Sequence, residues 1–382
     1  MHPEPSPGNS PALPHQLGIR FTGSGSEYFR IWIVNLLLTV LTLTLYLPWA
    51  KVRKLKYFHG NTLVGDAPLG FHGQARRMLR GYLLVALLFV LYTLAGQFSP
   101  IAGLVALVIL VAIAPALFRA ALQFRLANTS WRGLRLRFTG ELREAYLLAI
   151  PVVAMVALGV VLGFAGALQQ GGNTNVALVL LAAILLLQAW AGIWMLWRTK
   201  KYQHDHYALA TLRTRFDGRQ RQFAGLVLGC LGLAVLLMLL AAGLAAGAMA
   251  LGSAPDRQTR AMLLGLAPLA LLLLVFVLLK PYFVARLQNL VWNQTGGEAL
   301  QFHSRLRVRP MLALTLKNWL LIVLTLGLYW PFAAVAMARL RLQAVSLSLR
   351  DDPEQLADQL RTAQVDAAGD AAGDLFGIDV GL

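Results

Sequence analysis

Cysteine is almost absent from this chain: the one cysteine, Cys230, lies within an apolar run. A single cysteine can form neither an intrachain disulfide nor a cluster of thiolate metal ligands. The first residues are rich in proline and polar side chains, and they lack the basic start and apolar stretch of a cleavable secretory signal. We therefore expect no disulfide, no thiolate metal centre and no signal peptide.

Acidic residues are also scarce, at 17 Asp and Glu against 34 Lys and Arg, and charged residues make up only 13% of the chain. That share is about half the share in ordinary soluble domains. Hydrophobic residues reach 58%, more than a soluble fold of this length could bury, whereas a bilayer solvates them. Because the basic residues lie in short loops between long apolar runs, we do not expect nucleic acid as a partner.

Six apolar segments reach or approach the length that crosses a bilayer, and none contains Asp, Glu, Lys, Arg or His. They cover residues 81–98, 100–118, 145–167, 176–197, 223–252 and 261–279, and they pair into three hairpins with short tips. The loops at 50–80, 119–144, 198–222 and 280–317 hold 26 of the 34 Lys and Arg. Since basic loops stay cytoplasmic, the pattern predicts a multi-pass protein of a bacterial inner membrane with periplasmic tips.

Two further apolar segments flank the three hairpins and match each other. Residues 35–50 and 318–333 are identical at 11 of 16 aligned positions. The shared positions include the pairs Asn35 and Asn318, Thr42 and Thr325, Tyr46 and Tyr329, and Pro48 and Pro331. Apolar agreement arises easily by chance, but Asn, Thr, Tyr and Pro in register indicate duplicated units.

The duplicated segments, within residues 31–50 and 312–336, can be interpreted in two ways. As single spans they would cross the membrane in opposite senses and leave basic residues outside. We favour re-entrant elements that dip in and return, with Thr44 or Gly327 at the bend and a proline breaking the returning limb. Such backbone is tolerated at membrane depth only when other helices bury it. We expect Asn35 and Asn318 to satisfy its broken hydrogen bonds.

The basic loops share a short motif, Phe-x-Gly. Copies lie at Phe71–Gly73, Phe138–Gly140 and Phe216–Gly218, with one more at Phe21–Gly23 and a relative at Phe302–Ser304. The residues before it alternate between apolar and charged, as in Leu134–Phe138, which is the period of a β-strand. Asn61 and Asn128 stand ten positions before the motif, where we expect a turn. These patterns predict short cytoplasmic β-segments that cap the helices.

The expected fold is an all-α polytopic membrane protein with six to eight membrane segments, arranged as three helical hairpins flanked by two homologous re-entrant or spanning elements. Residues 1–20 are expected to be disordered, and residues 21–350 to form the membrane domain with internal repeats. Residues 351–382 carry eight acidic residues against one arginine. We expect this tail to be solvated and disordered.

Several of these motifs together resemble the YjgN-like family of bacterial inner-membrane proteins. They are Phe-x-Gly, then Asn-Leu-Leu-Leu-Thr from Asn35, then Tyr46–Ala50, then basic residues and Asn61-Thr62. The match covers residues 21–73 closely and recurs more loosely over 302–343. Thr44 departs from the family pattern, which favours Gly at the bend. The resemblance implies an inner-membrane location and this architecture, and since the family has no known function it implies no reaction.

Catalytic and metal-binding patterns are missing. His204-Asp205-His206 places two imidazoles two residues apart, but its spacing matches no known ligand set, so we expect no metal and no cofactor. The sequence contains no Gly-x-Ser-x-Gly, Walker or His-Glu-x-x-His motif, and its carboxylates are scattered among arginines. We therefore do not expect an enzyme.

Two functional classes remain. Tryptophans stand beside basic residues at the expected cytoplasmic boundaries, which suits contact with anionic phospholipid headgroups. The candidate headgroup contacts are Trp49, Lys51, Arg53, Trp131, Arg132, Arg135, Arg137 and Trp292. The leading interpretation is a lipid-interacting or envelope-organising protein with membrane phospholipids as partners. The alternative is a transporter or channel for an apolar or weakly polar solute, with Asn35, Gln188 and Asn318 lining its path.

Overall fold

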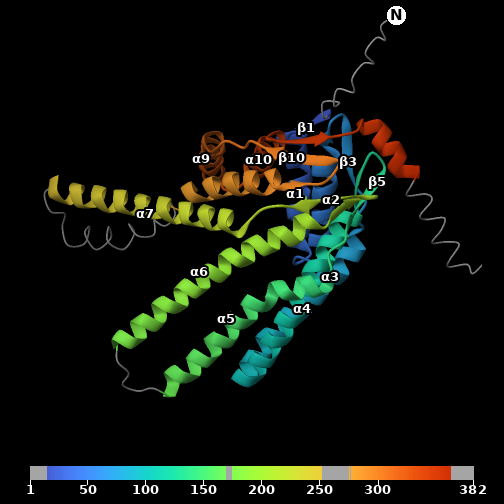
Figure 1. Cartoon of the computed structure of the whole chain (residues 1–382). Coiled ribbons are helices and arrows are strands. Elements are labelled where there is room, and N and C mark those ends of the chain that lie inside the picture. The colour runs from blue at the N-terminus through green and yellow to red at the C-terminus, as the bar shows by residue number, and fades with distance from the viewer. Residues whose placement is uncertain (1–14, 169–173, 252–274, 276, 363–382) are drawn as a thin grey trace, which may run out of the picture.

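A computed structural model describes residues 15–168, 174–251, 275 and 277–362 of the chain. In this part, long helices extend from a small β-sheet (Figure 1). The strands are β1 His15–Phe21, β2 Thr62–Val64, β3 Ala67–Phe71, β4 Thr129–Trp131, β5 Leu134–Phe138, β6 Tyr207–Leu209, β7 Leu212–Arg213, β8 Arg215–Phe216, β9 Thr295–Gly296, β10 Leu300–Ser304 and β11 Val345–Leu349. The helices are α1 Gly25–Leu41, α2 Leu47–Gly60, α3 Ala75–Phe98, α4 Pro100–Ala127, α5 Leu142–Leu168, α6 Thr174–Asp205, α7 Gln220–Leu251, α9 Val308–Leu324 and α10 Trp330–Gln343, with two more over residues 277–293 and 353–362.

The strands form one antiparallel sheet that is nearly closed on itself, which we call the strand ring. Its order is β7-β6-β5-β4-β3-β2-β1-β11-β10-β9-β8. Only Thr214 separates the two end strands, β7 and β8, so the ends of the sheet meet. The first strand, β1, pairs with the last, β11. The short β-segments predicted from the loops are thus parts of one sheet, and the expected all-α class omits it.

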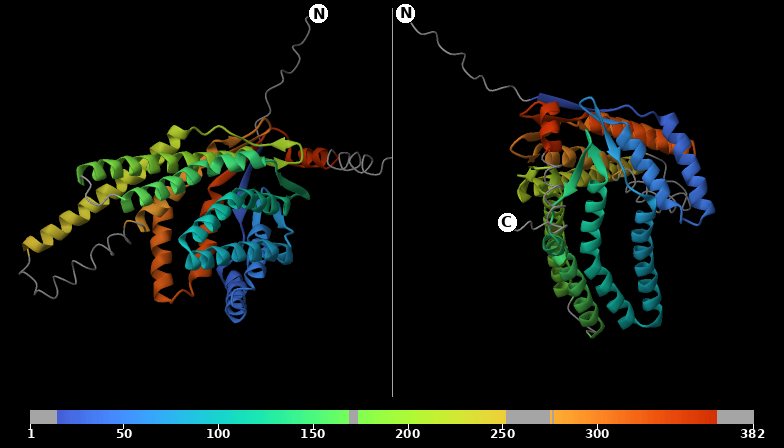
Figure 2. Two further views of the ribbon diagram at one scale, coloured as in Figure 1. Left: turned by 90° about the horizontal axis from the view of Figure 1, so that it is seen from below. Right: turned by 90° about the vertical axis from the view of Figure 1, so that its right-hand side faces the viewer.

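Helical hairpins leave the strand ring between strands that pair with each other. In the described part of the chain, α1–α2 connects β1 to β2, α3–α4 connects β3 to β4, α5–α6 connects β5 to β6, α7 and the helix over 277–293 lie between β8 and β9, and α9–α10 connects β10 to β11. The hairpins splay from the ring in different directions (Figure 2). Each unit therefore consists of a strand, a helical hairpin and a paired strand.

Neighbouring units are joined in a cyclic order. The returning helix of one hairpin contacts the outgoing helix of the next, as α4 contacts α5 and α10 contacts α1. A side chain near the end of a returning helix also donates a hydrogen bond to a carbonyl at the start of the next hairpin. These bonds are Arg339 to Gly23, Arg119 to Gly140, Trp197 to Gly218 and Asn289 to Leu306, at 2.7–2.9 Å. The last unit thus contacts the first in the same way as consecutive units contact each other.

The Phe-x-Gly motif forms the joint between strand and hairpin. The N–H of the middle residue donates to the carbonyl of the residue after the returning helix, at 2.8–3.0 Å. The five pairs are Thr22 and Asn61, His72 and Asn128, Thr139 and His206, Asp217 and Gln294, and Arg305 and Ala344. The Phe ring lies against the glycine: a Cβ added at Gly23 would come within 2.8 Å of the Phe21 ring, and one added at Gly218 would clash with the Phe216 ring. Glycine is needed there because the buried ring occupies the space of a side chain.

The fifth joint corrects the motif assigned from sequence. Its hydrogen bond falls on Arg305, so Ser304 takes the position of the Phe and Leu306 that of the Gly. The predicted copy Phe302–Ser304 is therefore wrong by two residues. Ser304 and Leu306 are both buried, at 2% and 4% exposure. In this joint the small residue stands at the first position and the large residue at the third, the reverse of Phe-x-Gly. Comparing residue types along the sequence cannot detect this exchange, whereas the pairing of Ser304 with Val345 establishes the alignment.

Asparagine and threonine side chains cap the C-terminal ends of the returning helices. The Asn61 amide donates to the carbonyl of Tyr57 at 2.9 Å, and the Asn128 amide to that of Phe124 at 2.7 Å. The hydroxyls of Thr62, Thr129 and Thr295 each donate to the carbonyl four residues earlier. These bonds satisfy carbonyls that a helix end leaves without intrahelical partners. The Asn predicted in a turn thus also caps a helix.

The first and last hairpins have the same dimensions. Helices α1 and α9 contain 17 residues, and α2 and α10 contain 14. At 1.5 Å per residue these helices are about 25 and 21 Å long, shorter than a hydrocarbon core of about 30 Å. Each of these two hairpins begins and ends at the strand ring. Pro48 and Pro331 lie in the first turn of α2 and α10 and therefore begin these helices, where proline fits, instead of breaking them.

Five helices in the described residues are long and apolar enough to cross a membrane. Their apolar stretches are Ala75–Phe98, Pro100–Ala127, Leu142–Gly159, Leu181–Asp205 and Gln220–Gly243. They overlap the first five predicted segments. Most of the sixth, 261–279, lies outside the described residues, as do residues 169–173 and 253–260 of two predicted tips.

Both ends of the chain differ from expectation where the structure describes them. Residues 15–20, expected to be disordered, form most of β1. In the predicted disordered tail, residues 353–362 form a helix (Figure 1, red). Its Leu356, Ala357 and Leu360 are buried in the ring's shared core. This apolar stripe was not predicted, because the expectation of disorder rested only on the acidic composition of the tail. Residues 1–14 and 363–382 lie outside the described residues.

Candidate lipid-facing surface

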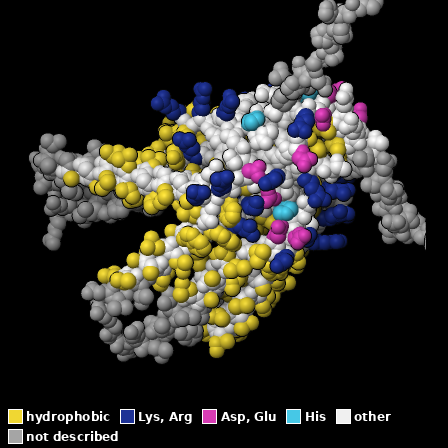
Figure 3. Space-filling view, viewed as in Figure 1, with side chains coloured by type: hydrophobic (Ala, Val, Ile, Leu, Met, Phe, Trp, Pro, Cys, Tyr) yellow, Lys and Arg dark blue, Asp and Glu magenta, His cyan; other side chains and the backbone are white. Residues whose placement is uncertain are grey.

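The long hairpins present an apolar outer surface. Large side chains such as Leu87, Leu186 and Leu239 are 59%, 73% and 66% exposed. Hydrophobic side chains cover these hairpins, whereas Lys and Arg gather where the hairpins meet the strand ring (Figure 3). A continuous apolar surface of this size would cause aggregation in water, whereas lipid chains solvate it. The surface is therefore suited to a bilayer.

Basic residues lie at the ring end of every candidate span, and we call them the basic band. The band comprises Arg76, Arg77 and Arg80 of α3, Arg119 and Arg125 of α4, Arg143 of α5, Arg198, Lys200 and Lys201 of α6, Arg221 of α7 and Arg219 just before α7. The far ends of the same helices carry no charged side chain in the described residues. In the described residues of these five helices, charge is thus confined to the ring end.

Four of the predicted headgroup contacts lie on the surface. Arg135 and Arg137 are exposed on β5, where they alternate with buried Leu134 and Phe138. Lys51 and Arg53 are exposed on α2. None of these four cations forms an ion pair among the described residues. Their charge is therefore available to an external anion.

Trp49 belongs to an aromatic group at the start of α2. It is partly buried and stacks on Tyr46, with ring centroids 6.0 Å apart. The guanidinium of Arg53 lies 5.8 Å from the centroid of the Tyr46 ring. A stacked aromatic pair beside a cation is typical of a membrane boundary.

Trp131, Arg132 and Trp292 have internal partners instead. Trp131 is 5% exposed in the core of the strand ring, and its indole N–H donates to the Val64 carbonyl at 3.3 Å. Arg132 lies 3.6 Å from Glu354, and its carbonyl accepts a hydrogen bond from Arg361 at 2.6 Å. Trp131 and Arg132 are covered because β4 pairs with β5 and the helix over 353–362 packs against this part of the strand ring.

Trp292 is partly buried and packs against two other rings. Its ring lies 5.2 Å from that of His204 and 4.8 Å from that of Phe302, measured between centroids. The two histidines of the His-Asp-His sequence have separate partners. His204 Nδ1 lies 3.1 Å from the Thr295 hydroxyl, and His206 Nε2 lies 3.1 Å from Glu144. Nowhere in the described ranges do three His, Cys, Asp or Glu side chains gather as metal ligands would.

Asn35 and Asn318 are buried, at 7% and 4% exposure. The side-chain carbonyl of Asn35 and both polar atoms of Asn318 lack hydrogen-bond partners among the described residues. The expectation that they satisfy the backbone of the bend is thus wrong for these atoms. The hydroxyls of Thr42 and Thr325 close it instead: each donates to a carbonyl of the first helix at 2.7 Å. Each also accepts the N–H of Tyr46 or Tyr329, at 3.0 and 2.9 Å.

The bend itself contains left-handed backbone in both copies. Leu43 and Thr44 have φ of +46° and +73°, and Leu326 and Gly327 have φ of +49° and +92°. The N–H of Thr44 donates to the Thr39 carbonyl at 2.8 Å, and that of Gly327 to the Ile322 carbonyl at 2.7 Å. The two bends therefore have the same backbone conformation, although only one contains glycine.

Two polar pairs near the ring ends of the helices were not predicted. Arg341 Nε donates to Gln288 Oε1 at 2.8 Å, and Gln288 Nε2 donates to the Arg341 carbonyl at 2.8 Å. Lys200 Nζ donates to Gln203 Oε1 at 3.2 Å. No local sequence signal could reveal the pair of Arg341 and Gln288, because its members come from α10 and the helix over 277–293.

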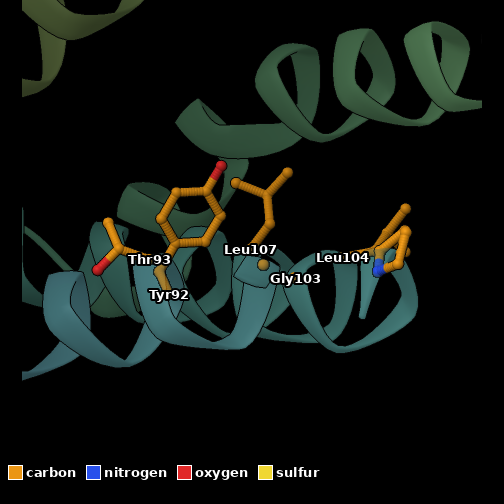
Figure 4. Close-up of a pocket in the computed structure, with 7 residues that line it drawn as sticks. Tyr92, Thr93, Gly103, Leu104 and Leu107 are labelled. Carbon is orange, nitrogen blue, oxygen red and sulfur yellow. The ribbon is translucent and has the colours of Figure 1, made fainter. Parts of the chain in front are cut away.

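A pocket of about 380 Å³ lies between α3 and α4 (Figure 4). Seven residues line it: Tyr92, Thr93, Gly96, Pro100, Gly103, Leu104 and Leu107. The helices approach closely there, since a Cβ on Gly103 would lie 3.0 Å from the Cα of Gly96. The Thr93 hydroxyl bonds to carbonyls of its own helix. This largely apolar lining suits an acyl chain better than a polar solute.

The comparisons with known proteins agree with this surface. The chain matches the family described as "Bacterial protein of unknown function (DUF898)" over residues 16–375. It is similar to Inner membrane protein YjgN of Salmonella typhimurium (strain LT2), at 27% identity over 339 residues, which are 84% of this chain and 86% of that relative. Proteins of the same name from Escherichia coli O157:H7 and K12 are 25% and 24% identical over 43% of each chain. No solved structure matches.

Proposed function

The chain belongs to the DUF898 family of bacterial proteins, and we propose that it is a multi-pass inner-membrane protein that binds anionic phospholipids at the base of its hairpins. It is a helical membrane protein of a family without known function, with relatives named inner membrane proteins. The observation that carries the proposal is the segregation of charge: apolar side chains cover the long hairpins and the basic band lies only at their ring ends (Figure 3).

The proposed topology places the strand ring in the cytoplasm. Basic residues flanking membrane spans are retained on that side, and all five candidate spans carry them at the ring end. The first and last hairpins would re-enter the membrane, since their helices are too short to cross it and return to the ring. A cysteine at Arg137 in a Cys230→Ala background should then react with an impermeant maleimide only after permeabilisation. Labelling in intact spheroplasts would contradict this orientation.

The proposed headgroup binding depends on exposed cations of α2 and β5 that have no ion-pair partner in the described part of the chain. Each Lys or Arg near an anionic leaflet contributes about 1 kcal/mol, and Lys51, Arg53, Arg135 and Arg137 have no carboxylate partner among the described residues. Arg198 lies 5.7 Å from the ring centroids of Trp194 and Trp197, which adds an interfacial anchor. An envelope-organising role would follow if the bound lipids recruit other molecules.

The proposal assigns the protein no catalytic step. Several polar-loop carboxylates bind neighbouring cations: Asp66 binds Arg20 at 2.9 Å and Asp217 binds Arg215 at 3.0 Å. The transport alternative receives less support. Apolar side chains and the helix over 353–362 fill the core of the strand ring. Gln188 is exposed whereas Asn35 and Asn318 are buried, so the three do not share one environment as the lining of a path would.

The test uses full-length protein in nanodiscs made from equal parts phosphatidylglycerol and phosphatidylcholine. We expect reversal of Lys51, Arg53, Arg135 and Arg137 to Glu to lower the phosphatidylglycerol fraction co-purifying with the protein, by at least about threefold given the contribution per charge. Lipids are quantified by mass spectrometry after extraction. The matched control exchanges the same residues for the other basic residue, Lys for Arg or Arg for Lys, and should retain the lipid ratio. An unchanged ratio in the reversed variant would contradict the proposal.

A further inference from the structure

We propose that the strand ring has a docking surface for a short, acidic amphipathic helix of a partner protein, and that the chain's own helix over 353–362 covers this surface as a displaceable lid. We call the surface the helix-binding surface. It comprises Val64, Trp131, Leu134, Leu347 and Leu349. The inference does not depend on the proposed lipid binding, because it does not use the exposed cations of α2 and β5.

The helix-binding surface is apolar and is formed by strands from separate parts of the ring. Its residues come from β2, β4, β5 and β11, and each is at most 9% exposed. The lid contributes three further buried residues to the same cluster, and no other described helix contributes any. Without the lid these strands would present a contiguous apolar patch, and such patches mark protein interaction sites.

The lid is amphipathic. Its buried residues are Pro353, Leu356, Ala357 and Leu360, which follow the spacing of a single helix face. The other residues of the lid are exposed, and they include two carboxylates and one arginine. The lid therefore shows which chemistry the surface accepts: a helix with an apolar stripe of this spacing and a polar outer face.

The hydrogen bonds and the ion pair between the described lid and the ring all involve Arg132, in the turn between β4 and β5. The Arg361 side chain donates to the Arg132 carbonyl at 2.6 and 3.2 Å, and Glu354 lies 3.6 Å from the Arg132 guanidinium. The buried Nε of Arg132 has no hydrogen-bond partner in the described part of the chain. A cation at the rim of an apolar surface favours a partner helix with a carboxylate at this position.

These polar contacts hold the lid weakly. The side chains of Glu354 and Arg361 are 81% and 53% exposed. Ion pairs that are this exposed contribute little to stability, because water and salt screen them. The lid is therefore held mainly by its few apolar side chains.

The lid is also short. It contains ten residues, and isolated helices shorter than about 12–15 residues are marginal in water. We therefore expect it to be helical only while docked, so its apolar contacts must offset the entropy of ordering it. It follows β11 on the side of the ring away from α6 and α7 (Figures 1 and 2). It can thus detach by local unfolding while the strand pairs of β11 with β1 and β10 stay formed.

The first measurement tests whether the lid detaches while the ring stays folded. Full-length protein in dodecyl maltoside carries one cysteine in a Cys230→Ala background, Ala357→Cys in the lid or Ala208→Cys in β6 as the matched control. The two alanines are 2% and 5% exposed. Because a buried thiol reacts with maleimide only after it opens to solvent, we expect Ala357→Cys to react at least about tenfold faster. Equal rates would mean that the lid opens only with the ring, which would overturn the proposal.

The second measurement tests docking. A fluorescent peptide with the sequence of residues 350–362 represents the partner helix, and fluorescence anisotropy reports its binding to full-length protein. The variant Leu356→Asp/Leu360→Asp should release its own lid. It should bind the peptide at least about tenfold more tightly than the wild type, whose tethered lid competes at high effective concentration. The matched control peptide carries the same two substitutions and should not bind.

Two further variants sharpen the docking test. Leu360→Ala weakens the lid without adding charge, so it should also bind the peptide more tightly than the wild type even if the double variant does not fold. Slow labelling of Ala208→Cys in each variant shows that the ring is folded. In the peptide, Glu354→Lys should weaken binding by about two- to fivefold through repulsion from Arg132. Unchanged binding of that peptide would overturn the acidic character of the partner.

The remaining outcomes concern the surface itself. Equal peptide binding by the wild type and the lid variants would mean that the peptide binds elsewhere. No binding to folded lid variants would mean that the helix over 353–362 is a permanent part of the core. Either result would overturn the proposed docking surface.

Discussion

The first and last hairpins are two copies of one structural unit, and they form equivalent bends and joints with partly different residues. Their helices have equal lengths, and Thr42 and Thr325 make equivalent bonds at the bend. They differ at the joint, where one has Phe21 and Gly23 and the other Ser304 and Leu306. They also differ at the bend, where Thr44 stands opposite Gly327. The shared geometry therefore depends on the threonine cap and on total volume at the joint more than on any single glycine.

The joint provides the larger test of this comparison. Phe21→Ser should lower the free energy of unfolding by about 3–5 kcal/mol because it empties a buried ring position. Gly23→Leu should lower it by about 1–3 kcal/mol, because the new side chain meets that ring. The double variant Phe21→Ser/Gly23→Leu reproduces the fifth joint and should cost less than the sum by at least about 1 kcal/mol. Denaturant unfolding in detergent micelles measures each value.

The reciprocal pair is the control for the joint. Ser304→Phe/Leu306→Gly installs the common motif in the fifth unit and should show coupling of the same sign. Strict additivity in both units would mean that the ring and the glycine do not share one space, contrary to the close approach of 2.8 Å between Phe21 and a Cβ on Gly23.

The bend should give smaller effects of opposite sign. Thr44→Gly should raise the free energy of unfolding by up to about 1 kcal/mol, because a φ of +73° strains a residue with a Cβ. Gly327→Thr should lower it by about 1–2 kcal/mol for the same reason. Thermal unfolding of both variants beside the wild type measures the pair. If Thr44→Gly destabilises the protein, the 3.2 Å contact of the Thr44 hydroxyl with Tyr82 outweighs the strain, and the two bends are not equivalent.

Much of the helical part could be predicted because its signals are local. The apolar segments at 81–98 and 100–118 correspond to α3 and α4, and the duplicated segments to the first and last hairpins. Strand alternation before Phe138 indicated β5. The exposure of the candidate headgroup contacts followed from local pattern only in part: Arg135 and Arg137 are exposed, whereas Trp131 and Arg132 have partners within the fold.

The sequence by itself determined that the chain is a membrane protein, where its apolar segments lie, and that its ends carry a duplicated turn. Composition and short-range spacing suffice for these features, since each depends on residues within a few turns of helix. Only the tertiary structure decided the closure of the strand ring, the burial of Leu356 and Leu360, and the hydrogen bonds between Gln288 and Arg341. These depend on pairing between segments far apart in the chain, which strand register and helix packing set and which no local pattern encodes.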